Sequence, residues 1–394
     1  MLSLFKDARV VALLLAATLT ILSNSIISPA LPGIEAAFDG TPNAALIVRL
    51  LVTAPALLVA AVAPFAGALA DRFGKRRQLL IGVVLFALTG SAGLWLDSLP
   101  AILVSRMMLG IAVAFIMTAQ TALIGDYFDG PMRGRFMGIQ IAATNLGGFV
   151  FLLIAGALAD RSPFFPFAIY LIALVYLPVF WISLTEPRRP TAEERAQMPA
   201  DDGEEGWMAK LIAVVTLGGL TFVCFYLIPT QAPYFLATIG HPEPTAAALL
   251  LAVMMLSGGI FSLLYGRVRM RLGRAMTPAL GYLGYAAAFG VLAISGNLAM
   301  ALVGALLLGL AVGFVMPALI SIVLDVAPAH RRGFASGAVA TSIFLGQFLS
   351  PLASAPIIAA VGYSETFAIV AVLMVCLSAM TVAFFRERRY PAYA

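Results

Sequence analysis

The stretch FAGALADRFGKRR, from Phe65 to Arg77, places one acidic and four basic side chains within its last seven residues. Charged residues make up only 11% of the 394-residue chain, whereas 62% of the residues are hydrophobic and the mean hydropathy is +1.00. A soluble domain contains about 45–50% apolar residues. Because lipid surrounds apolar helices directly, this composition predicts an integral membrane protein.

Twelve apolar runs are long enough to cross the hydrocarbon core of a bilayer, which takes roughly 20 helical residues. The runs are continuous rather than alternating, so they indicate helices and not the strands of a barrel. The sequence therefore predicts an all-α membrane protein with spans at about 10–31, 45–70, 77–96, 99–125, 135–159, 164–184, 208–236, 245–266, 275–295, 298–324, 334–360 and 364–385.

The basic residues follow an alternating pattern along these spans. All but three of the 24 Lys and Arg residues fall in segments on one side of the membrane, the exceptions being Arg49, Arg106 and Arg161. Because basic loops remain in the cytoplasm, we expect both termini on the cytoplasmic side of a bacterial-type inner membrane. The net charge of +5 then reflects topology, and no nucleic-acid partner is expected.

Several chemical functions are not indicated by the sequence. Cys224 and Cys376 both lie inside predicted spans, and His241 and His330 have no ligand-spaced partners. No metal site or disulfide framework is therefore expected. The GxxxxGK[ST] phosphate loop is also absent from the sequence. We accordingly expect a protein that is not an enzyme and needs no cofactor.

The opening stretch recurs 199 residues later, without a gap in the alignment between the copies. At this offset the sequence matches Gly67 with Gly266, Arg72 with Arg271, Gly74 with Gly273, Leu109-Gly110 with Leu308-Gly309, Asp126 with Asp325, Arg133-Gly134 with Arg332-Gly333, and Gly138 with Gly337. Such a repeat indicates two halves built on one plan. We predict six-helix bundles at 1–185 and 208–394, joined by a polar cytoplasmic linker at 186–207.

Three motifs resemble one transporter family. The stretch at 65–77 resembles motif A of the major facilitator superfamily, and SRMMLG resembles its motif B, with Arg106 and Gly110 on the matching positions. NSIISPALPGIEAAF is similar to the end of the first helix in the twelve-helix drug:proton antiporter branch. The resemblance implies two pseudo-symmetric bundles that rock about a central cavity. It also implies efflux of small hydrophobic or amphipathic compounds, driven by proton antiport.

The resemblance assigns a gating role to motif A. The expected gate residues are Gly67, Asp71, Arg72, Gly74, Arg76 and Asp126. Asp71 is expected near the start of the eleventh helix, where the helix dipole stabilises a carboxylate. Arg72 or Arg76 is expected to bond Asp126 when the cytoplasmic end is closed. Met270 replaces the aspartate in the second copy, so the lock is one-sided. The alternative is that the basic cluster only sets topology.

Arg106 and Asp126 are the candidates for proton coupling. A charge inside the bilayer is costly and usually functional, and the Arg matching Arg106 in related antiporters is implicated in proton transfer; the alternative is a structurally paired arginine. Two features depart from the family pattern. Asn24 stands where many drug exporters carry a titratable acid, and the fifth helix lacks a Gly-Pro motif, whose nearest echo is at 346–351.

Neutral polar and flexible side chains in the spans are candidates for binding a substrate. Amides, phenols and methionines suit an uncharged or amphipathic ligand, although each is equally explained by contacts between helices. The expected substrate-binding residues are Asn24, Arg106, Met117, Gln120, Gln140, Asn145, Tyr226, Gln231, Tyr234, Met255, Met316, Phe344 and Gln347.

Two other functions are compatible with this sequence. One is a dedicated exporter or importer of a single metabolite or siderophore, with or without coupling to protons. The other is a membrane receptor or scaffold that transports nothing, which the intact motif A disfavours. In each case the expected partners are a small molecule and the lipid bilayer, and we expect a monomer.

Overall fold

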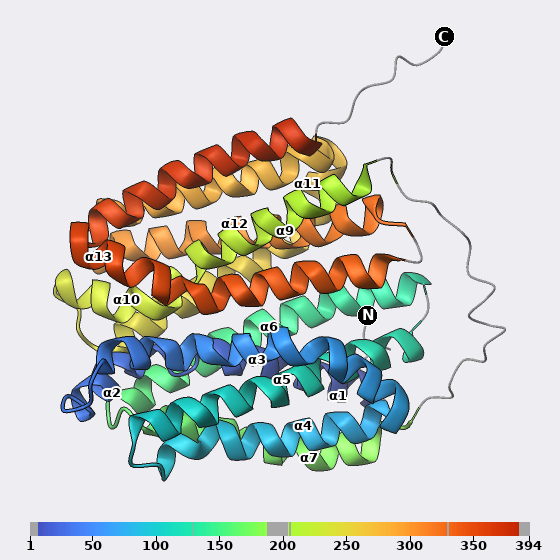
Figure 1. Cartoon of the computed structure of the whole chain (residues 1–394), viewed down its shortest axis with the longest axis horizontal. Coiled ribbons are helices and arrows are strands. Elements are labelled where there is room, and N and C mark those ends of the chain that lie inside the picture. Colours follow the sequence, from blue (N-terminus) through green and yellow to red (C-terminus); the bar gives the residue numbers. More distant parts are fainter. Residues whose placement is uncertain (1–6, 129, 187–203, 205, 329–330, 386–394) are drawn as a thin grey trace.

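A computed structural model of the chain describes residues 7–128, 130–186, 204, 206–328 and 331–385 (Figure 1). Among these residues, ten helices are long and apolar enough to cross a membrane. Two of the ten, α11 (Pro244–Ala293) and α13 (Arg332–Phe385), are broken at Gly273 and Gly362, which have φ angles of 79° and 86°. Each of these two helices therefore contributes two crossings, and the predicted twelve crossings are confirmed.

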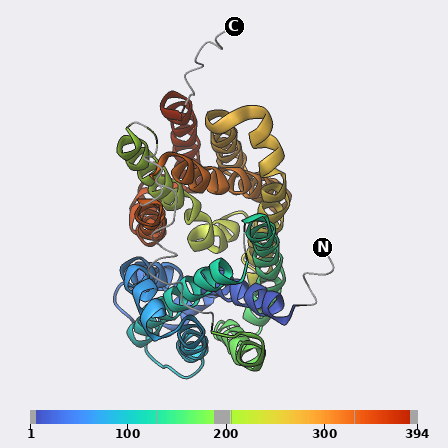
Figure 2. The same cartoon turned by 90° about the vertical axis from the view of Figure 1, so that its right-hand side faces the viewer.

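The chain forms two bundles of helices that lie side by side (Figure 2). The N-terminal half contains α1 (Ala8–Ser25), a 3₁₀ turn (Ser28–Ala30), α2 (Leu31–Ala37), α3 (Ala44–Phe73), α4 (Lys75–Gly90), α5 (Leu99–Tyr127), α6 (Gly130–Ala159), the 3₁₀ helix η4 (Phe165–Leu171) and α7 (Ile172–Ser183). The C-terminal half contains α9 (Trp207–Phe225), α10 (Leu227–Thr238), α11, α12 (Leu298–Val326) and α13.

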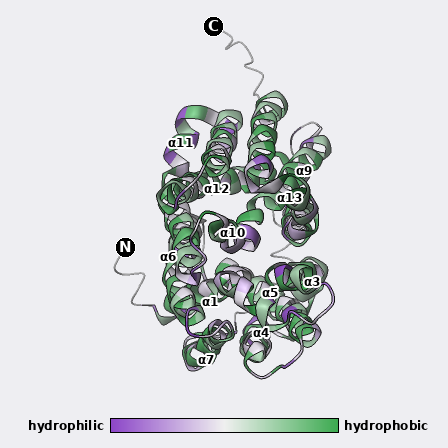
Figure 3. Ribbon diagram, turned by 90° about the vertical axis from the view of Figure 1, so that its left-hand side faces the viewer, coloured by the Kyte–Doolittle hydropathy of each residue, from purple (hydrophilic) through white to green (hydrophobic). Residues whose placement is uncertain are grey.

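The two ends of this double bundle differ in charge. One end, here called the basic end, carries the connections at 72–77 and 267–274, together with the start of α1 and the end of α13; it lies on the right in Figure 1. Arg9 at the start of α1 lies 5.1 Å from the ring of Tyr127 at the end of α5. The other end, here called the opposite end, carries α2 and α10, on the left in Figure 1; Figure 3 looks onto this end, with α10 near its centre.

The sequence repeat has a structural counterpart in how the helices begin. Ser98 and Asn297 are 199 residues apart, and each is the N-cap of a 29-residue helix. The Ser98 hydroxyl accepts the N–H of Ala101, and the Asn297 side chain accepts the N–H of Met300. Such caps satisfy backbone donors that the helix itself leaves free. The two halves thus start their fourth crossing in the same way.

The repeat also reappears where helices touch through their backbones. A methyl group on Gly110 would clash with the carbonyl oxygen of Pro55, and a methyl group on Gly309 would clash with that of Met254. Both members of each pair are 199 residues from their counterparts. Small residues permit this close packing of helices inside a membrane. Each half therefore contains a tight contact between its second and fourth crossings.

These two glycines should be intolerant of even the smallest side chain. We expect Gly110→Ala and Gly309→Ala each to destabilise the protein by about 1–3 kcal/mol, because the added methyl group overpacks a backbone contact. The measurement is thermal unfolding of the purified protein in one detergent. Gly290→Ala is the matched control: nothing lies within 4 Å of a methyl group there, so we expect a gain of up to about 1 kcal/mol from helix propensity.

Candidate functional site

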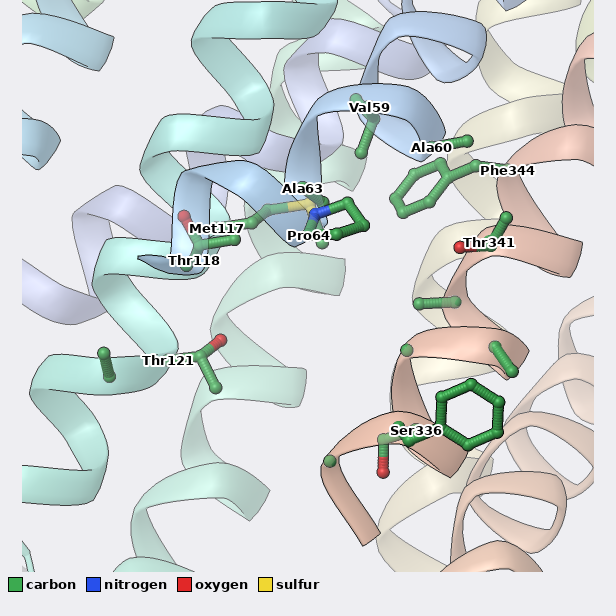
Figure 4. A pocket seen from close by; sticks show the side chains of 17 residues that line it. Val59, Ala60, Ala63, Pro64, Met117, Thr118, Thr121, Ser336, Thr341 and Phe344 are labelled. Carbon is green, nitrogen blue, oxygen red and sulfur yellow. The ribbon is translucent and has the colours of Figure 1, made fainter. Parts of the chain in front are cut away.

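A cavity of about 960 Å³ lies between the two halves. All 17 residues that line the cavity belong to α3, α5 and α13, and none of them is charged. Four hydroxyl groups interrupt an otherwise apolar lining (Figure 4): those of Thr118, Thr121, Ser336 and Thr341. A site of this kind matches the usual chemistry of small-molecule pockets, in which few polar groups are set in an apolar wall.

The cavity extends to the basic end of the molecule. Its lining includes Gly67 near the end of α3, and Gly333 and Phe334 at the start of α13. Phe334 is 59% exposed, and no atom lies within 4 Å of a methyl group placed on Gly67 or Gly333. The two halves are therefore apart where α3 and α13 reach this end.

At the opposite end, a polar cluster joins the two halves; we call it the latch and define it as Glu35, Arg49, Gln231, Tyr234 and Tyr363. The Tyr234 hydroxyl donates to Glu35 Oε2 at 2.5 Å, and Arg49 Nη1 lies 3.7 Å from the same oxygen. Gln231 Oε1 accepts from Arg49 Nε and from the Tyr363 hydroxyl, each at 3.3 Å. The Arg49 guanidinium also lies 4.2 Å from the Tyr234 ring.

The latch combines residues of both sequence halves. Glu35 and Arg49 come from α2 and α3, whereas Tyr234 and its neighbours come from α10 and from the break in α13. Only 16% of the Arg49 side chain is exposed, so its interactions are less weakened by water than those of a surface pair. Hydrogen bonds to charged groups and a cation–π contact therefore close the opposite end.

The contacts of motif A are those of a state in which the two halves are apart at the basic end, so the bond predicted between Asp126 and Arg72 or Arg76 in the closed state stays a prediction. Lys75 Nζ, rather than Arg72 or Arg76, bonds Asp126, at 2.5 Å from Oδ2. Arg76 instead donates to the backbone oxygen of Trp181 at 2.7 Å and covers its ring. The reason is geometric: after Gly74, with a φ of 105°, the chain begins α4 and directs Lys75 at the end of α5.

The start of α4 is further held by Glu186. Its carboxylate accepts the backbone N–H groups of Lys75 and Arg76, at 2.7 and 3.0 Å. A carboxylate at a helix N-terminus is stabilised by the helix dipole and by the free N–H groups. The contacts of Lys75, Arg76 and Glu186 all lie within the N-terminal half, so they do not depend on closure of the basic end. The Asp71 side chain lies outside the described part of the structure.

Arg106, the buried arginine of motif B, holds helices of the N-terminal half together. It is fully buried, and its Nε and Nη2 donate to the backbone oxygens of Leu51 and Ser23 at 2.9 and 2.7 Å. Its guanidinium lies 5.0 Å from the ring of Tyr170. Arg106 therefore connects α5 to α1, α3 and η4, and it is not among the residues that line the cavity.

The cavity brings together only some of the predicted substrate residues. Met117 and Phe344 line it, as does Gly67 from the predicted gate. The buried Gln120 donates to the backbone oxygen of Leu13 at 2.8 Å, and Tyr226 is also buried. These last two side chains pack within the protein instead of facing the cavity.

The remaining predicted residues are distributed over other parts of the fold. Gln231 and Tyr234 belong to the latch. Asn145 and Met255 lie where α6 packs against α11, since a methyl group on Gly259 would meet Asn145, and one on Gly148 would meet Met255. Outside the cavity lining lie the half-buried Gln140 and Met316 and the buried Gln347. The side chain of Asn24 lies outside the described part of the structure.

In the C-terminal half, ion pairs hold the basic end together. Arg269 pairs with Asp325, and Glu204 bonds Arg274 and Lys210, both at 2.5 Å. Burial raises the pKa of the Glu204 carboxyl, but hydrogen bonds from Arg274 and Lys210 outweigh burial, so this pKa lies below its ordinary value. Like Lys75 and Asp126, these groups act within one half.

Sequence reasoning missed the latch and most of the cavity lining. The sequence did contain a signal for part of the latch. Arg49 lies unusually at the start of the second span, and the acidic residue Glu35 lies just after the end of the first span. Nothing in the sequence pairs them with α10. The hydroxyl groups of Thr121 and Thr341 give no signal at all, because threonine is common in packed membrane helices.

Comparison with known proteins gives a consistent result. The family model described as "Major Facilitator Superfamily" matches residues 13–242 and 214–393. The chain is 27% identical over 317 residues to "Multidrug resistance protein 2" of Bacillus subtilis (strain 168), covering 76% of this chain and 77% of that protein. It is 25% identical over 337 residues to "Quinolone resistance protein NorA" of Staphylococcus aureus, covering 80% and 84%.

A similarity in fold extends to solved structures of lower sequence identity. The crystal structure of a D-xylose-proton symporter matches with a TM-score of 0.78 at 18% identity, covering 96% of this chain and 97% of that one.

The latch predicts a measurable effect of removing Arg49. Loss of a partly buried charged hydrogen-bonding group costs about 1.5–3 kcal/mol, which corresponds to roughly a 10- to 100-fold shift in a two-state equilibrium. We expect Arg49→Ala to populate a second, longer distance between spin labels at Asp39 and Glu243, which are exposed on the two halves at this end. The measurement is pulsed electron spin resonance.

Two conservative variants give the controls for this experiment. Arg49→Lys retains the charge and should shift the equilibrium less than Arg49→Ala. Tyr234→Phe retains the ring beneath the guanidinium and removes only the bond to Glu35, so it should also have a smaller effect. Distance distributions that are identical in all four proteins would contradict a gating role for the latch.

The lowered pKa of Glu204 predicts a pH-dependent contribution to stability. When the pKa of a carboxyl is lower in the folded than in the unfolded protein, the carboxyl stabilises the folded state at pH values above its unfolded-state pKa. This stabilisation is lost as the pH falls through the pKa of the folded state. We therefore expect Glu204→Gln to lower the unfolding temperature at pH 7, and this difference to shrink below about pH 4. Glu243→Gln, at a more exposed site, should have no such effect.

Proposed function

Because the chain belongs to the Major Facilitator Superfamily, we propose that it is a secondary active transporter that exports small hydrophobic or amphipathic compounds by alternating access. One observation carries this proposal: an uncharged cavity reaches the basic end, while the latch joins the halves at the opposite end. A site that is accessible from one end only is the arrangement that alternating access requires. The multidrug and quinolone resistance proteins named above support the class of substrate.

The distribution of basic residues supports an orientation in the membrane. We assign the basic end to the cytoplasm of a bacterial-type cell, because basic connections are retained on that side. Both termini are then cytoplasmic, and the cavity is open to the inside. In this orientation the latch closes the external side, so the structure corresponds to an inward-facing state.

Export then requires that the latch open and the basic end close. A bound substrate can drive this change only if it binds one state more tightly than the other. Closure at the basic end would bring α3 and the start of α13 together around Gly67 and Gly333. The role we propose for Asp71, Arg72 and Gly74 is to stabilise that closed state. Lys75, Arg76 and Glu186 keep the start of α4 fixed to the N-terminal half during the motion.

We assign proton coupling to Asp126 and a positioning role to Arg106. Asp126 follows the lining residue Ala122 by one helical turn, and 23% of its side chain is exposed. Protonation of the carboxylate would break its pair with Lys75 and so change the charge at the mouth of the cavity. Arg106, by contrast, donates to the backbone oxygens of Leu51 and Ser23 and so fixes helices within the N-terminal half.

Reconstituted transport tests this assignment. In liposomes, we expect uptake of a neutral or cationic lipophile against its gradient only when a pH gradient is imposed. Asp126→Asn should reduce this driven uptake at least about tenfold, because an amide cannot titrate, and should leave exchange without a pH gradient intact. Asp325→Asn is the matched control, since it removes the equivalent acid of the other half.

Other outcomes would point to the alternatives. Transport by the unaltered protein that ignores the pH gradient would exclude antiport. Movement of none of the tested lipophiles would favour a transporter dedicated to a single metabolite. Equal losses for Asp126→Asn and Asp325→Asn would assign Asp126 to structure.

A further inference from the structure

Three hydroxyl groups in the wall of the cavity make no hydrogen bond to the protein. They belong to Thr121, Ser336 and Thr341, and within the part of the chain that the structure describes none of the three has a hydrogen-bond partner. The fourth hydroxyl group, that of Thr118, donates to the backbone of its own helix and accepts from Gln78 Nε2, at 2.8 Å each. The cavity therefore offers three unused hydroxyl groups to a ligand that enters it.

Many other hydroxyl groups in the membrane helices of this protein bond to their own helix. Thr89 donates to the backbone oxygen of Leu85, and Ser342 donates to that of Val339, each at 2.8 Å. Such a local bond satisfies a hydroxyl group in apolar surroundings. Thr341 directly precedes Ser342 on α13 and lines the cavity, yet among the described residues its hydroxyl group has no such bond. The hydroxyl group of Thr341 is thus available to a ligand, whereas that of Ser342 is already used.

The three available hydroxyl groups come from both halves of the protein. Thr121 lies on α5, whereas Ser336 and Thr341 lie on α13, and Figure 4 shows Thr121 across the cavity from the other two. Ser336 and Thr341 are separated by about 7.5 Å along the axis of their helix, at 1.5 Å per residue. A ligand that bonds to Thr121 and to either hydroxyl group of α13 therefore joins the two halves.

The chemistry of the wall defines the ligand that fits it. A hydroxyl group is uncharged and both donates and accepts hydrogen bonds, so it suits the carbonyl, hydroxyl and amide groups of a neutral molecule. An ionised ligand would lose its hydration without meeting an opposite charge, because no residue of the lining is charged. A pure hydrocarbon would leave all three hydroxyl groups unbonded, and a site that offers hydrogen bonds discriminates against a ligand without matching groups.

We propose that the cavity selects uncharged lipophilic molecules with two hydrogen-bonding groups, one bonded by Thr121 and the other by Ser336 or Thr341. This inference rests on the proposed export function and narrows its substrate class to neutral compounds with oxygen or nitrogen at two separated positions. Because such a ligand bonds to both halves, it binds most tightly to a state in which α5 and α13 are closer together. A difference in affinity between states is what a substrate needs to drive the change between them.

Three probes with one carbon skeleton test the role of the ligand's hydrogen-bonding groups. Bisphenol A carries a hydroxyl group on each of its two rings, 4-cumylphenol carries one on a single ring, and 2,2-diphenylpropane carries none. Equilibrium dialysis against the purified protein in detergent measures each dissociation constant, with protein-free micelles as the blank. We expect Thr121→Val, and the double variant Ser336→Ala/Thr341→Val, each to weaken binding of bisphenol A about two- to tenfold, the range of one hydrogen bond. Both variants should bind 2,2-diphenylpropane as the unaltered protein does.

Ser342→Ala is the matched control, because it removes a neighbouring hydroxyl group that bonds to Val339 and does not line the cavity. It should leave the affinity for all three probes unchanged. Equal losses of bisphenol A and 2,2-diphenylpropane binding in the cavity variants would overturn the proposal, and so would a loss of bisphenol A binding in Ser342→Ala as large as that in Thr121→Val. Unchanged unfolding temperatures establish that each variant is folded.

The distance between the halves tests whether the ligand joins them. Spin labels at Arg77 and Arg271, which are exposed on the connections at the basic end, report this distance by pulsed electron spin resonance. We expect saturating bisphenol A to shorten it and saturating 4-cumylphenol, with a hydroxyl group at one end only, to leave it unchanged. Equal shortening by both probes, or no shortening by bisphenol A, would overturn the proposed joining of the halves.

These readouts separate the inference from the proposed function. Binding of bisphenol A that depends on Thr121, without driven transport of any lipophile in liposomes, would sustain the binding site and refute export. Driven transport that Thr121→Val leaves unchanged, and that bisphenol A and 2,2-diphenylpropane inhibit equally, would sustain export and refute the binding site.

Discussion

Inside each half, two helices lie so close that only a glycine fits between them, at Gly110 against Pro55 and at Gly309 against Met254. In a membrane there is no hydrophobic force that separates apolar helices from lipid, so association depends on close packing of this kind. The equivalent contact in both repeats makes each bundle a compact unit. Relative motion is then concentrated at the boundary between the bundles, and the cavity and the latch are both at this boundary.

The boundary itself is asymmetric. On one flank α6 and α11 are in close contact through Gly156 and Ala248, whereas on the other flank α3 and α13 separate around the cavity. The latch holds the halves together beyond the deep end of that separation. A rocking motion about the α6–α11 contact would open the latch and close the cavity, because the two lie at opposite ends of the boundary.

The charged groups illustrate two different uses of polarity in a chain that contains few of them. Arg106 donates to backbone oxygens and contacts an aromatic ring within one half, so these contacts hold the bundle together in any state. Arg49 also contacts Gln231 and Tyr234 of the other half, and these two contacts exist only when the opposite end is closed. An arginine therefore contributes to gating only when some of its partners belong to the other half of the protein.

The number of crossings, the division into two repeats and the basic end were determined by the sequence alone. Each of these depends on a local property: a long apolar run is needed to span lipid, and Lys and Arg are placed at its ends. Gly74 and Gly273, which the repeat aligns, both adopt a positive φ in the structure. The cavity was decided only by the tertiary structure. Gln231 and Tyr234 are polar residues of the kind that bind a substrate, but in the structure they belong to the latch. The sequence could not predict this, because a contact between segments about 200 residues apart leaves no periodic pattern in the sequence. Small neutral residues such as Thr121 and Thr341 line the cavity because the halves separate there, and this separation is a property of how whole helices pack.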